Sequence, residues 1–252
     1  MNIAHKVIAV TGAGRGLGRA VALMLVAEGA RLVLIDINRN DLEVTQAEVE
    51  SRGGECLLLP CNVADEGEVE AAFTRIRQHY GQLHGLVSCA GILRDGLLIK
   101  RRDGQLIDKL SLAQWQAVID VNLTGTFLCG REAAVLMSET GEGVIINVSS
   151  IARAGNMGQS NYAASKAGVA ALVVTWAREL SRYGIRVMGI APGVFATDMT
   201  AAMKPEAMER MRQAIPVGQL GEAAQLAETV RFIFHNDYLS GRMIEIDGGL
   251  RL

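Results

Sequence analysis

Tyr162 and Lys166 are the two residues of this sequence whose types and spacing point most directly to chemistry. A phenol is a poor acid near neutral pH, because its reference pKa is about 10. An ammonium group beside it favours the phenolate and lowers that pKa, so that a proton can pass to or from an alcohol or ketone oxygen. Four residues make about one helical turn, so the two side chains would share a helix face. The alternative is a surface tyrosine and lysine on an ordinary helix.

A glycine-rich segment from Thr11 to Gly18 lies upstream, between an apolar run and a helical pattern. Small residues let the backbone approach a pyrophosphate, and a helix N-terminus supplies free N–H groups and a partial positive charge. The order strand, glycines, helix predicts a dinucleotide-binding turn. The simple G-x-G-x-x-G pattern is not met from Gly12, because Leu17 stands where its last glycine would be. The alternative is a tight turn that binds nothing.

Asp36 ends the second predicted strand, about 20 residues beyond the glycines, where a carboxylate can accept hydrogen bonds from both ribose hydroxyls. It would repel a 2′-phosphate and therefore favours NAD over NADP. Arg15 and Arg39 point the other way, because either guanidinium could meet such a phosphate. We weight Asp36 more heavily, since the strand end fixes its position, and expect NAD(H) to be preferred with NADP(H) as the alternative. Asp36 could instead only cap the following turn.

Short aliphatic runs alternate with longer helical patterns along the whole chain. The predicted strands are Lys6–Val10, Arg31–Asp36, Glu55–Leu59, Gly85–Ser88, Val144–Val148, Arg186–Ile190 and Met243–Ile246. The predicted helices lie near residues 17–28, 40–51, 66–79, 112–137, 161–183 and 222–235. This alternation predicts one α/β domain over residues 1–252, with a parallel sheet and helices on both faces. The strands are nearly all apolar, as expected when both sheet faces are covered.

Two segments interrupt the alternation: a long loop at about 92–110 and a methionine-bearing segment at about 194–217. Long connections at the C-terminal side of parallel strands are where such sheets build their sites. We expect residues 194–217 to form a substrate lid, because thioethers adapt to flexible acyl chains. The alternative is a helix that packs its own apolar face. Lys100, Arg101 and Arg102 in the long loop could meet a phosphate of CoA or an acidic carrier, although such clusters are more often simply solvated.

Composition excludes several classes of function. The formal charge of −2 gives no general reason to expect nucleic acid as a partner. No apolar run approaches the roughly 20 residues that span a membrane, and no charged-then-apolar leader opens the sequence. The four cysteines form no C-x-x-C pair, and no histidine stands at metal-ligand spacing. We therefore predict a cytoplasmic enzyme without a metal.

With both motifs in place, the sequence resembles the short-chain dehydrogenase/reductase family over essentially its whole length. The positions that match the family's motifs, or stand in their places, are Gly12, Gly16, Gly18, Cys89, Ala90, Gly91, Asn122, Ser149, Tyr162, Lys166, Pro192, Gly193 and Thr197. The resemblance implies hydride transfer between a nicotinamide and a carbinol or carbonyl carbon. It also implies a homotetramer with strand order 3-2-1-4-5-6-7, which pairs subunits through the catalytic helices and the C-terminal strand.

The resemblance implies a role for each catalytic residue. Tyr162 would give or take the proton, and Lys166 would lower its pKa and bind the nicotinamide ribose. Ser149, thirteen residues before Tyr162, would hydrogen-bond the substrate oxygen. Asn122 would order a water relay that feeds Lys166. A developing alkoxide needs donors already aimed at it, and these residue types provide them.

The resemblance likewise implies a set of cofactor contacts. They are Gly12, Arg15, Gly16, Leu17, Gly18, Asp36, Asn62, Val63, Cys89, Ala90, Gly91, Tyr162, Lys166, Pro192, Gly193, Val194 and Thr197. Two positions depart from the family pattern. Cys89 replaces the usual Asn, which weakens a hydrogen bond that positions the backbone. Asn62 replaces the Asp that usually contacts adenine, and an amide can still donate and accept there.

Within the family, the sequence is most similar to 3-oxoacyl-[acyl-carrier-protein] reductases and related 3-hydroxyacyl-CoA dehydrogenases. Residues 184–193, 197–200 and 240–249 carry this likeness. Thr140 and Tyr183, with Arg182 adjacent, stand where carrier reductases place the basic residues that dock their acidic partner. An NAD-linked enzyme acting on a CoA thioester or another secondary alcohol therefore remains an alternative. A different class of alternative is a nucleotide-sensing regulator without turnover, which the retained catalytic residues disfavour.

Overall fold

Seven parallel strands form the central sheet of this computed structural model, which describes residues 1–196 and 205–251. The strands are β1 (Val7–Thr11), β2 (Arg31–Asp36), β3 (Cys56–Pro60), β4 (Gly85–Ser88), β7 (Gly143–Val148), β8 (Ile185–Pro192) and β9 (Met243–Ile246). Their order is β3-β2-β1-β4-β7-β8-β9. Counted among the strands of this sheet alone, that is the predicted order 3-2-1-4-5-6-7, so the predicted fold class is confirmed.

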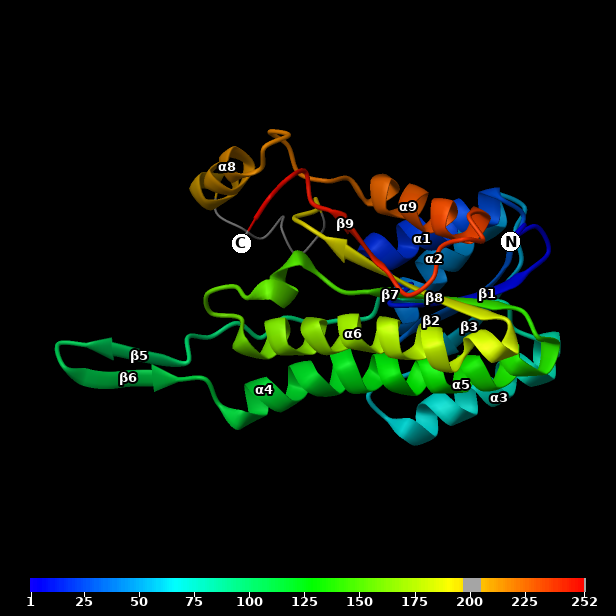
Figure 1. Ribbon diagram of the computed structural model, residues 1–252, viewed down its shortest axis with the longest axis horizontal. Coiled ribbons are helices and arrows are strands. Elements are labelled where there is room, and N and C mark those ends of the chain that lie inside the picture. The colour runs from blue at the N-terminus through cyan, green and yellow to red at the C-terminus, as the bar shows by residue number, and fades with distance from the viewer. Residues whose placement is uncertain (197–204, 252) are drawn as a thin grey trace.

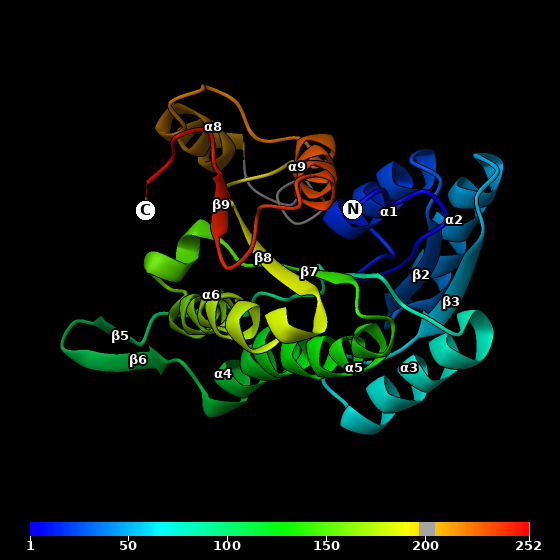
Figure 2. The ribbon, with the colours of Figure 1, turned by 45° about the vertical axis from the view of Figure 1, so that its right-hand side comes forward.

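Helices cover both faces of the sheet (Figures 1 and 2). They are α1 (Gly16–Ala27), α2 (Arg39–Ser51), α3 (Glu66–Tyr80), α4 (Leu112–Ile119), α5 (Gly125–Thr140), α6 (Ser160–Glu179), α8 (Pro205–Ala214) and α9 (Ala223–His235). Figure 2 shows α1, α2 and α9 on one side of the strands and α3, α4, α5 and α6 on the other. Each predicted strand and helix corresponds to an element of the structure, within a few residues at its ends.

The core consists of two main apolar clusters, one on each face of the sheet. In β1, Ile8 and Val10 belong to the cluster that contains α1 and α9, whereas Val7 and Ala9 belong to the cluster that contains α3 and α5. All four side chains are fully buried. Because successive side chains of a strand point to opposite faces, a sheet covered on both faces requires apolar residues at every position. This requirement explains the apolar runs of the sequence.

The helix predicted over residues 112–137 is interrupted in the structure. It divides into α4, a π-helical turn at Asp120–Thr124, and α5. Its start is fixed by a capping box, in which the Ser111 hydroxyl and the Gln114 side chain satisfy each other's backbone N–H groups. Single π turns are frequent at functional sites. Here the turn contains Asn122, whose side chain is fully buried.

The long loop predicted near 92–110 contains an antiparallel hairpin, formed by β5 (Ile99–Arg102) and β6 (Gln105–Lys109). We call residues 99–109 the arm, and Figure 1 shows it projecting from the body of the molecule. Asp103 and Gly104, at its turn, have φ angles of 50° and 77°. Asp-Gly is a preferred pair for a turn with two positive φ angles, because glycine bears this conformation without strain and aspartate tolerates it. The loop prediction missed this signal.

The segment predicted as a lid, about 194–217, contains α8 and a single bridge between Phe195 and Gly221. Residues 197–204 of that segment, including Thr197, lie outside the described residues.

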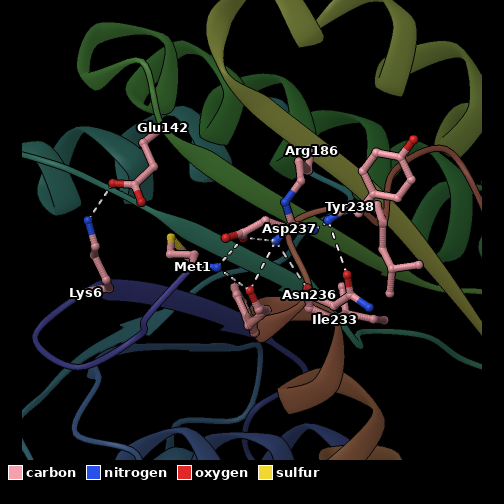
Figure 3. Close-up of polar contacts among 10 residues, drawn as sticks. Met1, Lys6, Glu142, Arg186, Ile233, Asn236, Asp237 and Tyr238 are labelled. Atoms are coloured by element: carbon pink, nitrogen blue, oxygen red, sulfur yellow. Dashed lines mark hydrogen bonds and ion pairs between the residues drawn. The ribbon is translucent and has the colours of Figure 1, made fainter.

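On the other side of the molecule, Arg186 joins β8 to the end of α9 (Figure 3). Its guanidinium donates to the carbonyl oxygens of Ile233, Phe234 and Leu239 at 3.2, 3.2 and 2.8 Å. Among the described residues, no helix is both long and apolar enough to cross a membrane.

Candidate active site

The glycine turn passes so close to the end of β4 that only glycine fits. A Cβ on Gly12 would lie 2.9 Å from the Cα of Ala90, and its φ of 66° disfavours any other residue. A Cβ on Gly18 would collide with the carbonyl oxygen of Gly12. The hydroxyl of Thr11 accepts a hydrogen bond from the Ala90 amide at 3.2 Å. These contacts bring the predicted phosphate loop and the Cys89-Ala90-Gly91 segment together.

Side chains from α1 and α2 hold the backbone of this turn. The Thr45 hydroxyl donates to the carbonyl oxygen of Ala13 at 2.9 Å, and the Arg19 guanidinium donates to that of Gly14. Helix α1 then begins at Gly16, directly after Arg15, whose side chain is exposed and does not cap the helix. Leu17 packs against the core beneath the turn. The first N–H groups of α1 therefore remain available to an anionic ligand.

Asp36 contacts the turn from the end of β2. One carboxylate oxygen accepts from the Gly14 amide and the other from the Asn38 amide, both at 3.0 Å. The turn-capping role considered above is thus present, and the carboxylate is also fixed beside the glycines. The guanidinium of Arg39 forms an ion pair with Glu43 at 2.9 Å. Of the two arginines that argued for NADP, Arg39 is thus paired, whereas Arg15 forms no ion pair with residues 1–196 or 205–251.

The opposite side of the predicted cofactor site is formed by Asn62, Val63 and Cys89. The Asn62 side-chain oxygen accepts from the Ala64 amide at 3.1 Å, which fixes the turn after β3. Val63 packs on α5, where a Cβ on Gly125 would lie 2.8 Å from its methyl carbon. Burial raises the pKa of the Cys89 thiol to about 12, although the charge of Lys166 opposes this change. Cys89 is therefore a neutral, partly buried group at neutral pH.

Lys166 lies under the predicted nicotinamide end of this site, with 5% of its surface exposed. Its ammonium donates to the Val148 carbonyl oxygen at 2.8 Å and lies 5.6 Å from the centre of the Tyr162 ring. Burial lowers the pKa of Lys166 to about 8, because the charged form loses hydration. The lysine is thus aimed at the end of β7 and is only partly charged above pH 8.

Tyr162 behaves differently from the sequence expectation. Its pKa is raised above the usual value, first because the phenol is buried and also because of the negative charge of Asp95. A hydrogen bond with Ser150 opposes this rise of the Tyr162 pKa but does not reverse it. The expected lowering of the Tyr162 pKa by Lys166 is therefore not observed. The physical reason is that the ammonium is hydrogen-bonded to Val148, while burial penalises the phenolate.

The two adjacent serines at the end of β7 have different partners. The Ser149 hydroxyl donates to the Lys166 carbonyl oxygen at 2.7 Å, so its proton is already used within the protein. The Ser150 hydroxyl accepts from the Ala152 amide at 3.1 Å and hydrogen-bonds the Tyr162 phenol. The structure therefore places Ser150, and not the predicted Ser149, in contact with the phenol of Tyr162, the predicted proton donor.

Asn122 fastens the segment after Gly91 to the π turn. Its amide group donates to the Ile92 carbonyl oxygen at 3.0 Å, and its side-chain oxygen accepts from the Ile92 amide at 2.8 Å. A Cβ on Gly91 would lie 3.3 Å from that side-chain oxygen and 3.7 Å from the Lys166 ammonium. Asn122, Gly91 and Lys166 therefore meet as predicted. A water relay through Asn122 stays a prediction.

The last predicted cofactor contacts lie where β8 ends beside β9. Gly193 donates its amide to the Ile246 carbonyl oxygen at 3.0 Å, and a Cβ there would lie 2.7 Å from the Cα of Asp247. Pro192 is the last residue of β8, and Val194 packs against the small apolar cluster around Ile151. This cluster links the loop after Ser150 to the C-terminal tail.

The structure thus gathers the described members of the predicted site along the C-terminal edge of the sheet. Sequence reasoning missed two groups near the phenol, Ser150 and Asp95. A serine next to the predicted one offered a signal, but residue spacing alone does not separate two neighbouring hydroxyls. Asp95 gave no signal, because only the folded structure brings its charge near Tyr162. Within residues 1–196 and 205–251, no group of three potential metal ligands is found.

Comparison with known sequences shows the family. The profile of the short chain dehydrogenase family matches residues 6–207. The protein belongs to the short-chain dehydrogenase family, and it is accordingly an NAD(P)-dependent oxidoreductase that acts on CH–OH groups.

Several relatives are similar over nearly the whole chain. The 3-oxoacyl-[acyl-carrier-protein] reductase FabG of Thermotoga maritima is 37% identical, with 99% of both chains covered. The 3-oxoacyl-[acyl-carrier-protein] reductase of Rattus norvegicus is 38% identical, with 98% of both chains covered. A crystal structure of a putative gluconate dehydrogenase from Agrobacterium tumefaciens matches with a TM-score of 0.91 and 31% identity, covering 99% of this chain and 97% of that one. Their names differ in substrate, since two are reductases of 3-oxoacyl-[acyl-carrier-protein] and the third is a putative gluconate dehydrogenase.

Proposed function

We propose that the protein interconverts a 3-oxoacyl thioester and its 3-hydroxyacyl form. The observation that carries this proposal is the Tyr162 phenol, hydrogen-bonded by Ser150 and placed beside the buried Lys166 at the sheet edge that holds the glycine turn. The relatives named 3-oxoacyl reductases support the substrate class. The second candidate is an NAD-dependent 3-hydroxyacyl-CoA or other secondary-alcohol dehydrogenase, which Asp36 favours.

The glycine turn fits a dinucleotide, because at Gly12 and Gly18 a side chain would fill the space that the backbone uses for close approach. Gly12, Gly16 and the first turn of α1 would hold its pyrophosphate, and Asp36 its adenosine ribose. The bound dinucleotide supplies or accepts the hydride. The remaining chemistry belongs to the side chains of this chain.

In reduction, the substrate carbonyl oxygen gains a proton as it becomes a hydroxyl. Because the pKa of Tyr162 is raised, the phenol is protonated at neutral pH and can supply that proton. Ser150 accepts from Ala152, so its own O–H is free to donate toward the phenol oxygen or a substrate oxygen. A protonated Lys166 stabilises the phenolate left behind, and in oxidation the steps run in reverse.

NAD(H) is the proposed preferred cofactor. Asp36 would receive the two ribose hydroxyls and repel a 2′-phosphate, while Arg39 is already paired with Glu43. Arg15 is the remaining guanidinium that could accept a phosphate. The direct test is a comparison of kcat/KM for NADH and NADPH with acetoacetyl-CoA, and a strong preference for NADPH would contradict this reading of Asp36.

We propose that the acyl group of the substrate is attached either to CoA or to a carrier protein, and that neither is favoured over the other. Thr140 and Tyr183 replace the basic residues with which carrier reductases meet their partner, so one electrostatic attraction is missing. The test compares acetoacetyl-CoA, the matching carrier-protein thioester and a panel of simple ketones. Reduction of ketones alone would support the second candidate.

Tyr162→Phe tests whether the protein is an enzyme at all. The variant removes the proton donor and leaves the ring, so we expect loss of turnover with cofactor binding retained. A nucleotide-sensing regulator would differ already before mutation. The unmutated protein would bind cofactor but oxidise neither NADH nor NADPH with any thioester or ketone in the panel.

We also propose a homotetramer. The outer surface of α5 and α6 carries a hollow lined by apolar side chains, among them Phe127, Val135, Trp176 and Tyr183. Exposed apolar patches of this kind commonly mark contacts between proteins. Light scattering on the eluting protein measures the state directly, and a monomer at micromolar concentration would exclude the tetramer.

A further inference from the structure

Asn161, next to Tyr162 on α6, makes three hydrogen bonds although its side chain is completely buried. Its amide group donates to the carbonyl oxygens of Arg94 at 2.9 Å and Gln114 at 3.1 Å. Its side-chain oxygen accepts from the Tyr162 amide at 2.8 Å. A primary amide is the side-chain group that offers two donors and an acceptor in one plane, and this site uses all three.

The two carbonyl oxygens belong to the two ends of the segment that carries the arm. Arg94 precedes the arm, and Gln114 follows it in the first turn of α4. The chain leaves the body near Arg94, forms the arm and returns near Gln114, and the Asn161 side chain bonds the backbone at both points. The neighbouring contacts reinforce this junction: Gln159 donates to Asp95 at 3.0 Å, and the Gly96 amide donates to Gly158 at 2.8 Å.

The third bond reaches the reacting residue. Helix α6 begins at Ser160, so the Tyr162 amide is one of the first N–H groups of the helix and has no partner within it. Asn161 supplies that partner. Lys166 lies one turn further along, and Ser150 lies on another element, so neither depends directly on this contact. The position of the phenol relative to those two groups is therefore the quantity that Asn161 controls.

We propose that Asn161 is a positioning residue, which ties both ends of the arm-bearing segment to the first turn of α6 and so fixes the Tyr162 phenol for proton transfer. The proposal rests on the proposed function for its kinetic consequences. Loss of the amide leaves two carbonyl groups and one N–H group buried without a partner. The first turn then shifts, and the phenol with it, while the glycine turn stays in place.

The principal experiment compares Asn161→Ala and Asn161→Asp with wild type. Asn161→Asp keeps the acceptor for the Tyr162 amide but places a carboxylate against two carbonyl oxygens. We expect both variants to lose about 10- to 100-fold in kcat, since misplacements near 1 Å cost this much. The Kd for NADH should change by less than about twofold, because only the phenol and not the glycine turn has moved. Asn2→Ala is the control, because it removes one exposed side-chain hydrogen bond, the one that Asn2 accepts from the Ala4 amide, away from the arm junction.

A second measurement separates this proposal from the proposed function. The titration of Tyr162, followed by NMR of ring-labelled tyrosine and assigned with Tyr162→Phe, should move when Asn161 is replaced and should not move in the control Asn2→Ala. This shift is expected even if no 3-oxoacyl thioester is reduced. Wild-type kcat in Asn161→Asp would overturn the role of the arm-bearing segment. An unchanged Tyr162 titration, or equal losses of kcat and NADH affinity, would overturn the positioning role altogether.

Discussion

Ser149 and Ser150 are neighbours in the chain, yet their hydroxyl groups bond to different parts of α6. Ser149 donates to the backbone of Lys166 at 2.7 Å, whereas Ser150 hydrogen-bonds the phenol of Tyr162. The first contact holds β7 against the helix. The second contact adjusts the group that transfers the proton. We therefore propose a catalytic role for the Ser150 hydroxyl and a structural role for the Ser149 hydroxyl.

Ser150→Ala is expected to lower kcat by about 10²- to 10³-fold, the usual loss when one donor to a developing oxyanion is removed. Ser149→Ala should lower kcat less than about tenfold and destabilise the fold by about 1 kcal/mol, through loss of a buried hydrogen bond. Steady-state kinetics and denaturant unfolding of both variants provide the check. If Ser149→Ala is the more damaging to kcat, the original assignment from residue spacing is restored.

The pH dependence of reduction follows from Lys166 and Tyr162. The phenol stays protonated through neutral pH because its pKa is raised, so it does not limit the rate there. The Lys166 charge, which stabilises the developing phenolate, is lost as pH rises through about 8. We therefore expect kcat for reduction to be flat below pH 7 and to fall above pH 8. A profile that is flat up to pH 10 would show that the lysine keeps its charge in the working complex.

The same lowered pKa means that a charged Lys166 destabilises the folded protein. The unfolded chain binds the lysine proton below its ordinary pKa of 10.5, but the folded chain binds it only below about 8. Between these values the unfolded state holds more protons, so the Lys166 contribution to stability falls as pH drops from 10.5 to 8 and is constant below. Lys166→Met should therefore be inactive yet more stable than wild type at pH 7, by on the order of 1–3 kcal/mol. Urea unfolding at pH 7 and at pH 10 tests this: the gain should shrink at the higher pH.

Cofactor choice is predicted to depend on Asp36. Asp36→Ser removes the carboxylate that repels a 2′-phosphate, so the ratio of kcat/KM for NADPH to that for NADH should rise by about 10- to 100-fold. Stability should fall by about 1 kcal/mol, because the Gly14 and Asn38 amides lose an acceptor. Arg39→Ala is the control, and we expect it to leave the ratio within about twofold, since Arg39 is paired with Glu43. A large change in the control would assign cofactor choice to Arg39.

The strands of the sheet were predictable because each one is marked by residues that are neighbours in the sequence. Strands buried on both faces must be continuously apolar, and the glycines and caps around them mark where each strand ends. The interruption at Asp120–Thr124 was not predictable, because the apolar spacing of a helix continues through a π turn and only the buried hydrogen bonds of Asn122 reveal it. The arm was missed because its aliphatic residues are exposed, so its sequence carries no core-facing pattern.

The residues of the candidate site likewise fall into those that the local sequence indicates and those that only the folded structure reveals. Gly12, Asp36 and Lys166 follow from chemistry at fixed positions after strands and on one helix, and the structure brings them to one edge of the sheet. The identity of the serine and the direction of the Tyr162 pKa depend on burial and on side-chain direction, which residue types and spacing do not contain. For that reason the predicted direction of the Tyr162 pKa shift was wrong, while the choice of Ser149 as the catalytic serine stays a prediction beside the proposed Ser150. Asn161 belongs to the same group, since its sequence neighbours give no sign of the two distant carbonyl groups that it holds.

Arg186 gives a stability prediction outside the site. Its side chain is 16% exposed, and it donates to three carbonyl oxygens at the end of α9 and pairs with Asp237 at 3.3 Å (Figure 3). Arg186→Leu removes the guanidinium donor from all three oxygens, although the Phe234 oxygen keeps its bond from the N-terminal ammonium. We therefore expect a loss of about 2–4 kcal/mol of unfolding free energy.

Asp237→Asn is the matched control for Arg186, because it removes the ion pairs of Asp237 with Arg186 and with the N-terminal ammonium and keeps the contacts of Arg186 with the carbonyl oxygens. The Asp237 side chain is 73% exposed, so this variant should cost less than about 1 kcal/mol. Both variants should retain wild-type KM for NADH, since this junction lies at the end of the sheet opposite the glycine turn. Equal destabilisation by the two variants would mean that the ion pair, and not the carbonyl contacts, holds α9 to β8.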